Sequence, residues 1–432
     1  MSQSFKFGEP LLYAEPNWYQ GWVSPYYKPK HEAWRAKVRT FVEKELRPHV
    51  DKWEEDAVMG NEMPWREFLP KAYAEGIFAP LYPTEFGGTP PEGGWDAFMD
   101  LIWNDEIARA GCAGVNSCFA IITMALPPIL KHGSKALQAK YVPQLVRAES
   151  QIALCISEPY AGSDVAGLRA TARLEGDHYV LNGEKKWITC GVFADYYTVA
   201  ARTGPAGHKG LSLFLVERAW PGIEVKRLKL QGHWTSGTAL VLFRDVKVPK
   251  ENLIGQENQG FKYIMHNFNH ERLLIAIQAN RCSRGLLQQS MDYGFKRKTF
   301  GKTLLEHQVI RQKLADMAMR VESVHALLEQ TCYQIDQGIG EEKLGGPCAL
   351  AKVLATRSLE VCVREASQIF GGASFVRGGV GNFVERIGRD LRGMVIPGGS
   401  DEILADLAVR QALVYTQRAR MEAELASGPS KL

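Results

Sequence analysis

Residues 154–168 read LCISEPYAGSDVAGL, and the pattern of residues along the chain changes from helical to β-rich at this stretch. It starts as a strand would and then runs into Pro159, Gly162, Ser163 and Asp164, which are typical of a polar loop. A strand that leads into such a loop leaves backbone amides and hydroxyls free to bind a ligand, although most loops of this composition bind nothing. The stretch therefore predicts a strand and, by itself, leaves a ligand site open.

The segment before this stretch predicts helices. Trp34, Val38, Phe41 and Val42 have the spacing of one helix face, and helical periodicity continues to about residue 150. Residues 1–30 differ, because their aromatic residues and prolines favour an extended arm packed on the surface.

The segment after this stretch predicts short strands and then long helices. Residues 174–184 and 239–248 are rich in β-forming residues, with Gly-Asp and Asn-Gly turns in the first of them. Such a series of short strands favours a small barrel or sandwich. No proline lies between Pro249 and Pro347, which is consistent with a helical bundle.

The predicted fold is therefore mainly α with a β-barrel middle domain (α+β). We expect an extended arm over 1–30, an N-terminal helical domain over 31–150, the β-barrel over 151–257, a four-helix-bundle domain over 258–425 and a flexible tail over 426–432.

The composition excludes several classes of partner. The 432 residues are 45% hydrophobic and 23% charged, which is ordinary for a globular protein with two or three domains' worth of core. A net charge of +4 is too small to predict nucleic-acid binding. The sequence contains no run of 18 apolar residues, so it predicts no membrane span. The eight cysteines form no CxxC motif, so we expect buried thiols and no metal site.

The final tripeptide, Ser430-Lys431-Leu432, is a peroxisomal address that an import receptor reads. If the source is eukaryotic, this predicts a peroxisomal protein. In a bacterium the tripeptide would carry no information, and the chain would be cytoplasmic. The first residues match neither a signal peptide nor a mitochondrial presequence.

Six segments in register identify a family that the chain resembles over about residues 35 to 415, the acyl-CoA dehydrogenases. They are residues 154–168, 186–189, 243–249, 297–308, 368–372 and 392–403. The resemblance implies FAD-dependent conversion of a fatty or branched acyl-CoA to trans-2-enoyl-CoA. It also implies a homodimer or homotetramer with FAD at the subunit interface.

The resemblance implies two groups of FAD-binding residues. The isoalloxazine ring would be lined by Leu154, Ile156, Ser157, Trp187, Ile188 and Thr189, with Ser400 and Glu402 near the flavin at a helix start. Ser163 would also bind the cofactor. Arg297 and Thr299 would reach the pyrophosphate of a neighbouring subunit's FAD. His307 and Gln308 would also approach FAD, and its adenosine end would be met by Gln368, Ile369, Gly371 and Gly372. Arg297 could instead belong to a solvated basic cluster with Lys296 and Lys298.

The catalytic base is displaced from its usual place in the family. Residues 392–403 read RGMVIPGGSDEI, and Gly398 stands where relatives commonly have a catalytic Glu. The resemblance implies that the Gly398 backbone N–H still donates to the thioester oxygen, together with a flavin ribityl hydroxyl.

Residues 270–275, HERLLI, match the helix that carries the base in the long-chain and isovaleryl branches. Glu271 is therefore predicted to remove the α-proton. From the residues alone, a surface Glu paired with a cation one turn away is the favoured interpretation of Glu271, and the family resemblance together with Gly398 reverses it. Asp401 and Glu402 are rival carboxylates, which a helix start would also favour.

The resemblance further implies that Ser163, Arg272 and Arg410 contact acyl-CoA or orient the site, with a helix-surface salt bridge as the alternative for Arg410. Trp234 stands where Arg is frequent in the family. The electron acceptor could be electron-transferring flavoprotein or O₂. A nitroalkane oxidase-like enzyme and a non-catalytic flavin-bearing binding protein are the other readings.

Overall fold

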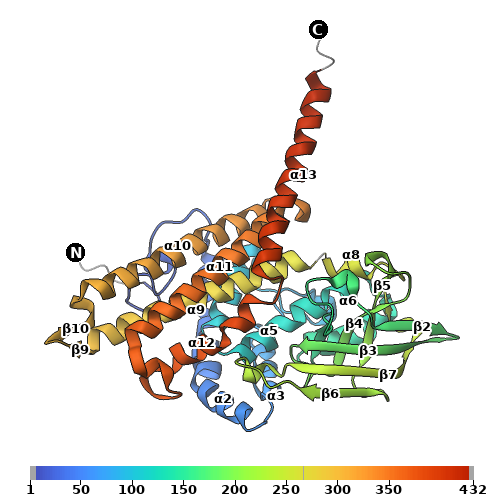
Figure 1. The fold of residues 1–432 in the computed structure, drawn as a ribbon, viewed down its shortest axis with the longest axis horizontal. Helices are drawn as coiled ribbons and strands as arrows, with labels where there is room; N and C mark the ends of the chain where they lie inside the picture. Colours follow the sequence, from blue (N-terminus) through green and yellow to red (C-terminus); the bar gives the residue numbers. More distant parts are fainter. Residues whose placement is uncertain (1–5, 266, 428–432) are drawn as a thin grey trace.

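A computed structural model of the chain describes residues 6–265 and 267–427 (Figure 1). Its first group of elements is helical, and the expected helix face is confirmed because Trp34, Val38 and Phe41 are buried in α1. The helices are α1 (Pro29–Phe41), α2 (Val50–Val58), α3 (Trp65–Ala74), α4 (Ala97–Ala108), α5 (Ala113–Ala125), α6 (Pro127–His132) and α7 (Lys135–Val146).

The second group is a mixed β-sheet, which confirms the β-rich middle region. Its strands are β1 (Ile152–Cys155), β2 (Thr171–Glu175), β3 (His178–Ile188), β4 (Tyr196–Arg202), β5 (Leu211–Glu217), β6 (Ile223–Arg227), β7 (Ala239–Pro249) and β8 (Leu253–Ile254). The strands lie in the order β6-β7-β3-β2-β4-β5-β8, and β1 pairs with β4 in parallel. The register of β3 against β7 shifts between Lys185 and Ile188, so β3 carries a bulge there.

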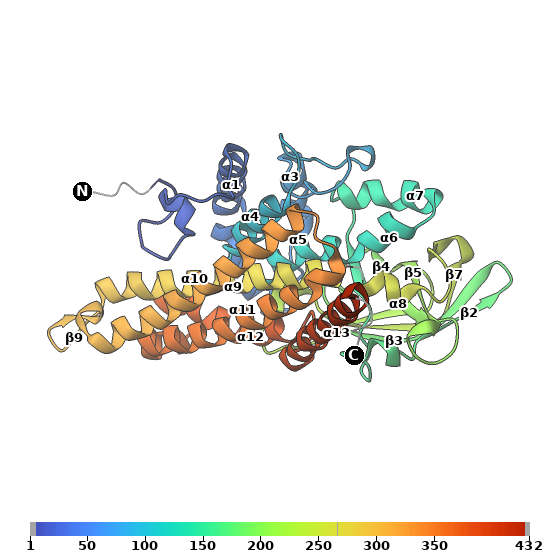
Figure 2. The ribbon, with the colours of Figure 1, turned by 90° about the horizontal axis from the view of Figure 1, so that it is seen from above.

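The third group is a bundle of long helices. Its elements are α8 (Gly260–Met265), α9 (Phe268–Lys296), β9 (Lys298–Thr299), β10 (Lys302–Thr303), α10 (Gln308–Asp336), α11 (Glu341–Phe370), α12 (Asn382–Val395) and α13 (Asp401–Ser427). Helices α9, α10 and α11 pack on one another, and α13 projects away from the body (Figure 1). The small β9–β10 hairpin, which the sequence did not predict, lies at the end of the bundle remote from the sheet (Figures 1 and 2).

Helix α5 lies in the middle of the fold. Together with α6 it forms an apolar segment, Ala113–His132, that by length and composition alone could cross a membrane. However, 78% of its most apolar window is buried inside the protein, as a core helix would be. All eight cysteines are buried and free, as expected.

The N-terminal arm is embedded more deeply than a surface arm. Glu15 is fully buried, and its carboxylate accepts hydrogen bonds from Arg39 at 3.0 Å, Arg109 at 3.2 Å and Arg281 at 3.1 Å. Burial would raise the pKa of Glu15, but the three guanidiniums outweigh it and lower the pKa to about 2. The arm is extended apart from short turns such as Asn17–Gln20, as expected, but it packs into the protein and not only on its surface. The arm supplies the shared anion that joins α1, α9 and the end of α4.

Candidate active site

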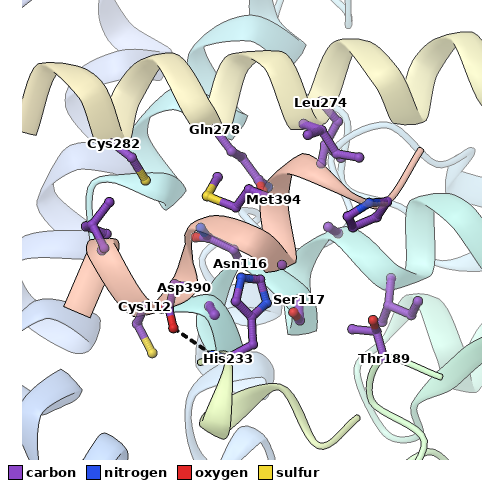
Figure 3. Close-up of a pocket in the computed structure, with 18 of the residues that line it drawn as sticks. Cys112, Asn116, Ser117, Thr189, His233, Leu274, Gln278, Cys282, Asp390 and Met394 are labelled. Atoms are coloured by element: carbon purple, nitrogen blue, oxygen red, sulfur yellow. Dashed lines mark hydrogen bonds between the residues drawn. The ribbon is translucent and has the colours of Figure 1, made fainter. Parts of the chain in front are cut away.

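A pocket of about 130 Å³ lies between α5, α9 and α12 (Figure 3). From α9 it is lined by Leu274, Ile275, Gln278 and Cys282, whose spacing is that of one helix face. The other walls are formed by Gly111, Cys112, Ala113, Asn116, Ser117, Ala120, Ile121, Met124, Thr189, His233, Ile387, Asp390, Gly393, Met394 and Pro397. The pocket thus brings the N-terminal helices, the sheet and the bundle together at one site.

Glu271 lies one turn before Leu274 and Ile275, on the same face of α9. Its side chain is buried, so it is not the surface partner of an ion pair. Asn267 Nδ2 donates to Glu271 Oε1 at 3.0 Å and to the backbone oxygen of Thr123 in α5, also at 3.0 Å. Burial raises the pKa of Glu271 to about 7, against the opposing effect of the Asn267 hydrogen bond. The site therefore holds a carboxylate whose proton affinity suits a general base near neutral pH.

The two neighbours of Glu271 have different partners. His270 Nε2 lies 3.0 Å from Asp100 Oδ2 of α4. Burial would lower the pKa of His270, but the Asp100 carboxylate outweighs it and raises the pKa. Arg272 Nε donates to the backbone oxygen of Gly398 at 3.2 Å, so the helix with the predicted base also holds the predicted oxyanion loop.

Gly398 occupies a position that only glycine fits easily. Its φ is +72°, and a Cβ built there would lie 2.8 Å from Ile275 Cδ1. The buried Lys352 of α11 donates to the backbone oxygens of Val395 and, at 3.0 Å, of Gly399. Burial lowers the pKa of Lys352 to about 8. Arg272 and Lys352 thus fix the loop around Gly398 from two helices.

The segments predicted to line the isoalloxazine lie against each other. The fully buried Lys185 donates from Nζ to the backbone oxygen of Ile156 at 2.9 Å, and Lys186 N–H donates to that of Ser157 at 2.9 Å. The bulge in β3 contains Trp187, which has a φ of +61° and is 49% exposed, while Thr189 reaches the pocket. Ile188 and Ile156 are buried, Leu154 and Ser157 are half-buried, and Ser163 is exposed in the loop that follows.

The second predicted group of FAD residues lies far from this pocket. Gln278 and Arg297 are 19 positions apart on α9 and its C-cap (297 − 278), which is roughly 28 Å of helix. Tyr293 stacks on Phe370 with ring centroids 4.3 Å apart, so the C-terminal ends of α9 and α11 meet there. This end of the bundle holds Arg297, Thr299, His307, Gln308, Gln368, Ile369, Gly371 and Gly372.

That end of the bundle is suited to a polar, extended ligand. Arg297 and Gln368 are exposed, and Thr299 Oγ1 lies 3.3 Å from His307 Nε2. A Cβ on Gly371 or Gly372 would meet nothing within 4 Å, so the backbone there is open to close approach. Thr189 of the first group lines the pocket, whereas the second group lies at the far end of the bundle, and this separation fits an FAD shared between subunits.

Some predicted residues are not brought to the pocket. Arg410 is exposed on α13 and pairs with Asp406 at 2.7 Å, which is the helix-surface salt bridge of the alternative interpretation. The substrate role of Arg410 is therefore not supported within one chain, because α13 leaves the body. Asp401 is occupied by Arg357, at 3.1 Å, and the exposed Glu402 has its pKa lowered by its own backbone N–H and then by the Ser400 hydroxyl. Asp401 is therefore already paired and Glu402 is exposed, so neither rival carboxylate is both buried and, within the described residues, free of a paired cation as Glu271 is.

Several residues that build the site were missed in the sequence. Asn267 precedes Glu271 by four residues, a spacing that could have indicated the contact. Lys352 and His233 gave no local signal, since the partners of Lys352 lie 43 and 47 residues away in the chain and that of His233 lies 157 residues away. Trp234, in the place of a frequent Arg, packs beneath Arg389, whose guanidinium carbon is 3.8 Å from the ring centroid.

Known proteins match the chain along nearly its whole length. Family models match in order: the acyl-CoA dehydrogenase N-terminal domain over residues 28–149, the middle domain over 153–246 and the C-terminal domain over 258–413. The acyl-CoA dehydrogenase apdG of Emericella nidulans is 40% identical, with 92% of this chain and 94% of that protein aligned.

Solved structures agree with the family models. Butyryl-CoA dehydrogenase from Megasphaera elsdenii is 30% identical with a TM-score of 0.82, covering 90% of this chain and 100% of that one. An acyl-CoA dehydrogenase from Bacillus anthracis complexed with FAD is 26% identical with a TM-score of 0.83, covering 92% and 69%.

Proposed function

Because this chain belongs to the acyl-CoA dehydrogenase family, we propose that it converts a fatty or branched acyl-CoA to the trans-2-enoyl-CoA with Glu271 as the base. The family makes the chain an FAD-dependent oxidoreductase. One observation carries the assignment of the base: Glu271 is a buried carboxylate on the pocket-lining face of α9, where Gly398 offers no side chain.

In the proposed reaction, Glu271 takes the α-proton of the acyl thioester. The Gly398 backbone N–H donates to the thioester oxygen, where negative charge develops, and Arg272 and Lys352 hold the loop that carries this donor. When bound, FAD supplies the acceptor for the hydride that leaves the β-carbon. Burial of the Glu271 side chain keeps its carboxylate basic.

Anaerobic titration of the FAD-loaded enzyme with acyl-CoAs of graded length and branching tests this function. We expect at least one thioester to bleach the flavin absorbance, with the matching enoyl-CoA as product. Bleaching by nitroethane alone would identify a nitroalkane oxidase-like enzyme. Retention of FAD without bleaching by any substrate would leave only a binding protein.

The pKa of Glu271 predicts how activity depends on pH. Only the carboxylate can accept the α-proton, so kcat/KM should rise about tenfold per pH unit below a pKa of about 7 and level off above it. The measurement is kcat/KM across pH 4 to 9 at constant ionic strength, a range that includes both that pKa and the ordinary value of 4.5. An acid limb near pH 4.5, the ordinary value for Glu, would show that burial does not set the proton affinity of the base.

The reduced enzyme passes its electrons either to electron-transferring flavoprotein or to O₂. Stopped-flow mixing of reduced enzyme with O₂ separates the two: fast reoxidation assigns an oxidase, and negligible reoxidation assigns the flavoprotein. The proposed compartment is the peroxisome in a eukaryotic source, supported by Ser430-Lys431-Leu432, which lies outside the described residues.

A further inference from the structure

One wall of the pocket is polar, and the proposed reaction makes no use of it. Asn116 of α5, Gln278 of α9, Asp390 of α12 and His233 line the same pocket (Figure 3). Asn116 is more than nine-tenths buried, and its Oδ1 has no hydrogen-bond partner among the described residues. His233 Nε2 is likewise buried without a partner there. Most buried polar atoms in folded proteins are paired, so two unpaired ones at the same pocket point to a polar group bound between them.

The fold makes room for the His233 ring. Its backbone N–H donates to Asp390 Oδ1 at 2.6 Å, which fixes the loop against α12. A Cβ built on Gly393 of α12 would lie 2.4 Å from the imidazole Nε2. His233 itself has a φ of +56°, a conformation that histidine adopts more readily than most residues. The imidazole therefore fills space that a glycine in α12 leaves open.

The polar wall lies beyond the reacting carbons. The start of α9 is joined to the end of α5 by the hydrogen bond from Asn267 to Thr123, beside Glu271. Seven residues along each helix from there, at Gln278 and Asn116, the two helices line the same pocket. Seven residues of helix span about 10 Å, so the wall faces a part of the acyl group several carbons past the α-carbon.

We propose that the acyl group of the substrate carries a hydroxyl near its far end, bound between His233 and Asn116. The hydroxyl oxygen accepts from His233 Nε2–H, and its proton is donated to Asn116 Oδ1. A plain alkyl chain would leave both buried atoms unpaired, whereas an anionic substituent would face the Asp390 carboxyl. This inference rests on the proposed acyl-CoA oxidation and specifies its substrate class.

The test compares acyl-CoAs of equal length with and without a hydroxyl at the last, second-last or third-last carbon. Flavin reduction by the FAD-loaded enzyme is followed anaerobically, and kcat/KM is compared within each pair. We expect at least one hydroxylated substrate to be preferred by about tenfold to a hundredfold, since each unpaired buried group carries a penalty of that order. Equal or better turnover of the plain chain overturns the inference and leaves acyl-CoA oxidation intact.

Two variants locate the preference. Asn116→Leu is nearly isosteric on a regular helix, and His233→Asn tolerates the positive φ but withdraws the imidazole. Each should bring the ratio of the two kcat/KM values towards one. Met124→Leu changes an apolar residue of the same pocket and should leave the ratio unchanged, whatever it does to both rates.

A preference that survives both polar variants, each with FAD retained, overturns the inference. If no acyl-CoA reduces the wild-type flavin, the proposed function fails and the inference fails with it. That result differs from the loss of hydroxyl preference in an enzyme that still oxidises plain acyl-CoA.

Discussion

Replacement of Glu271 by Gln should lower the rate of flavin reduction by acyl-CoA by about 10² to 10⁴-fold. Gln has the same shape, and its Oε1 can still accept the hydrogen bond from Asn267. It cannot take a proton from the α-carbon. Binding of FAD and of acyl-CoA should persist, so the loss should fall on the reduction step and not on KM.

Anaerobic stopped-flow reduction of the FAD-loaded variant measures this loss. Asp292→Asn is the matched control, because it neutralises another carboxyl on α9. Asp292 lies about 20 positions from Glu271 along this helix and therefore far from the pocket. In the control variant, acyl-CoA should reduce the flavin at the wild-type rate. A near-wild-type rate for Glu271→Gln would mean that Glu271 is not the base, and Asp401 and Glu402 would become the next carboxyls to replace.

Glu15→Gln should lower the free energy of unfolding by about 3–5 kcal/mol at neutral pH. The substitution removes the negative charge on which Arg39, Arg109 and Arg281 converge, and it leaves three guanidiniums underpaired in the interior. It also removes the contact that anchors the arm. Urea denaturation of the FAD-loaded protein, followed by circular dichroism, should show a lower midpoint.

Glu9→Gln is the control for the arm. Glu9 contacts Arg109 at 3.2 Å, but its side chain is 37% exposed, so its loss should cost less than about 1 kcal/mol. The Glu15 effect should also depend on pH. Because the folded pKa is lowered to about 2 from 4.5, the stabilisation is present above pH 4.5 and disappears as the pH falls towards 2. Equal costs for the two variants at pH 7 would contradict a buried anion at the centre of the cluster.

The sequence predicted the architecture because the architecture depends on local patterns. Helical periodicity around Trp34, the turn signals of residues 174–184 and the long proline-free stretch each report a neighbourhood of ten to a hundred residues. The six motifs added the family and placed Glu271 on its helix. The fold, the family and the helix that carries Glu271 can therefore be predicted without knowing which distant segments are in contact.

The rest of the site depends on contacts between distant residues. The fate of Glu15 is decided by arginines at 39, 109 and 281, and its neighbourhood of aromatics and prolines only indicated an extended segment. Arg410 matched a family position, yet α13 carries it away from the pocket. The polar wall of Asn116, Gln278, Asp390 and His233 comes from three helices and a loop, so no single stretch of sequence contains it.

The burial that makes Glu271 a good base also sets a thermodynamic penalty on the native state. Between pH 4.5 and about 7 the folded protein retains a proton that the unfolded chain has released. Stability therefore declines as the pH rises through this window, by about 3 kcal/mol in total at 1.36 kcal/mol per unit of pKa shift. Selection for a stable fold alone would replace this carboxylate with a neutral side chain. The ionisable side chain at the start of α9 thus lowers the stability of the fold, and its proposed role in catalysis accounts for its presence there.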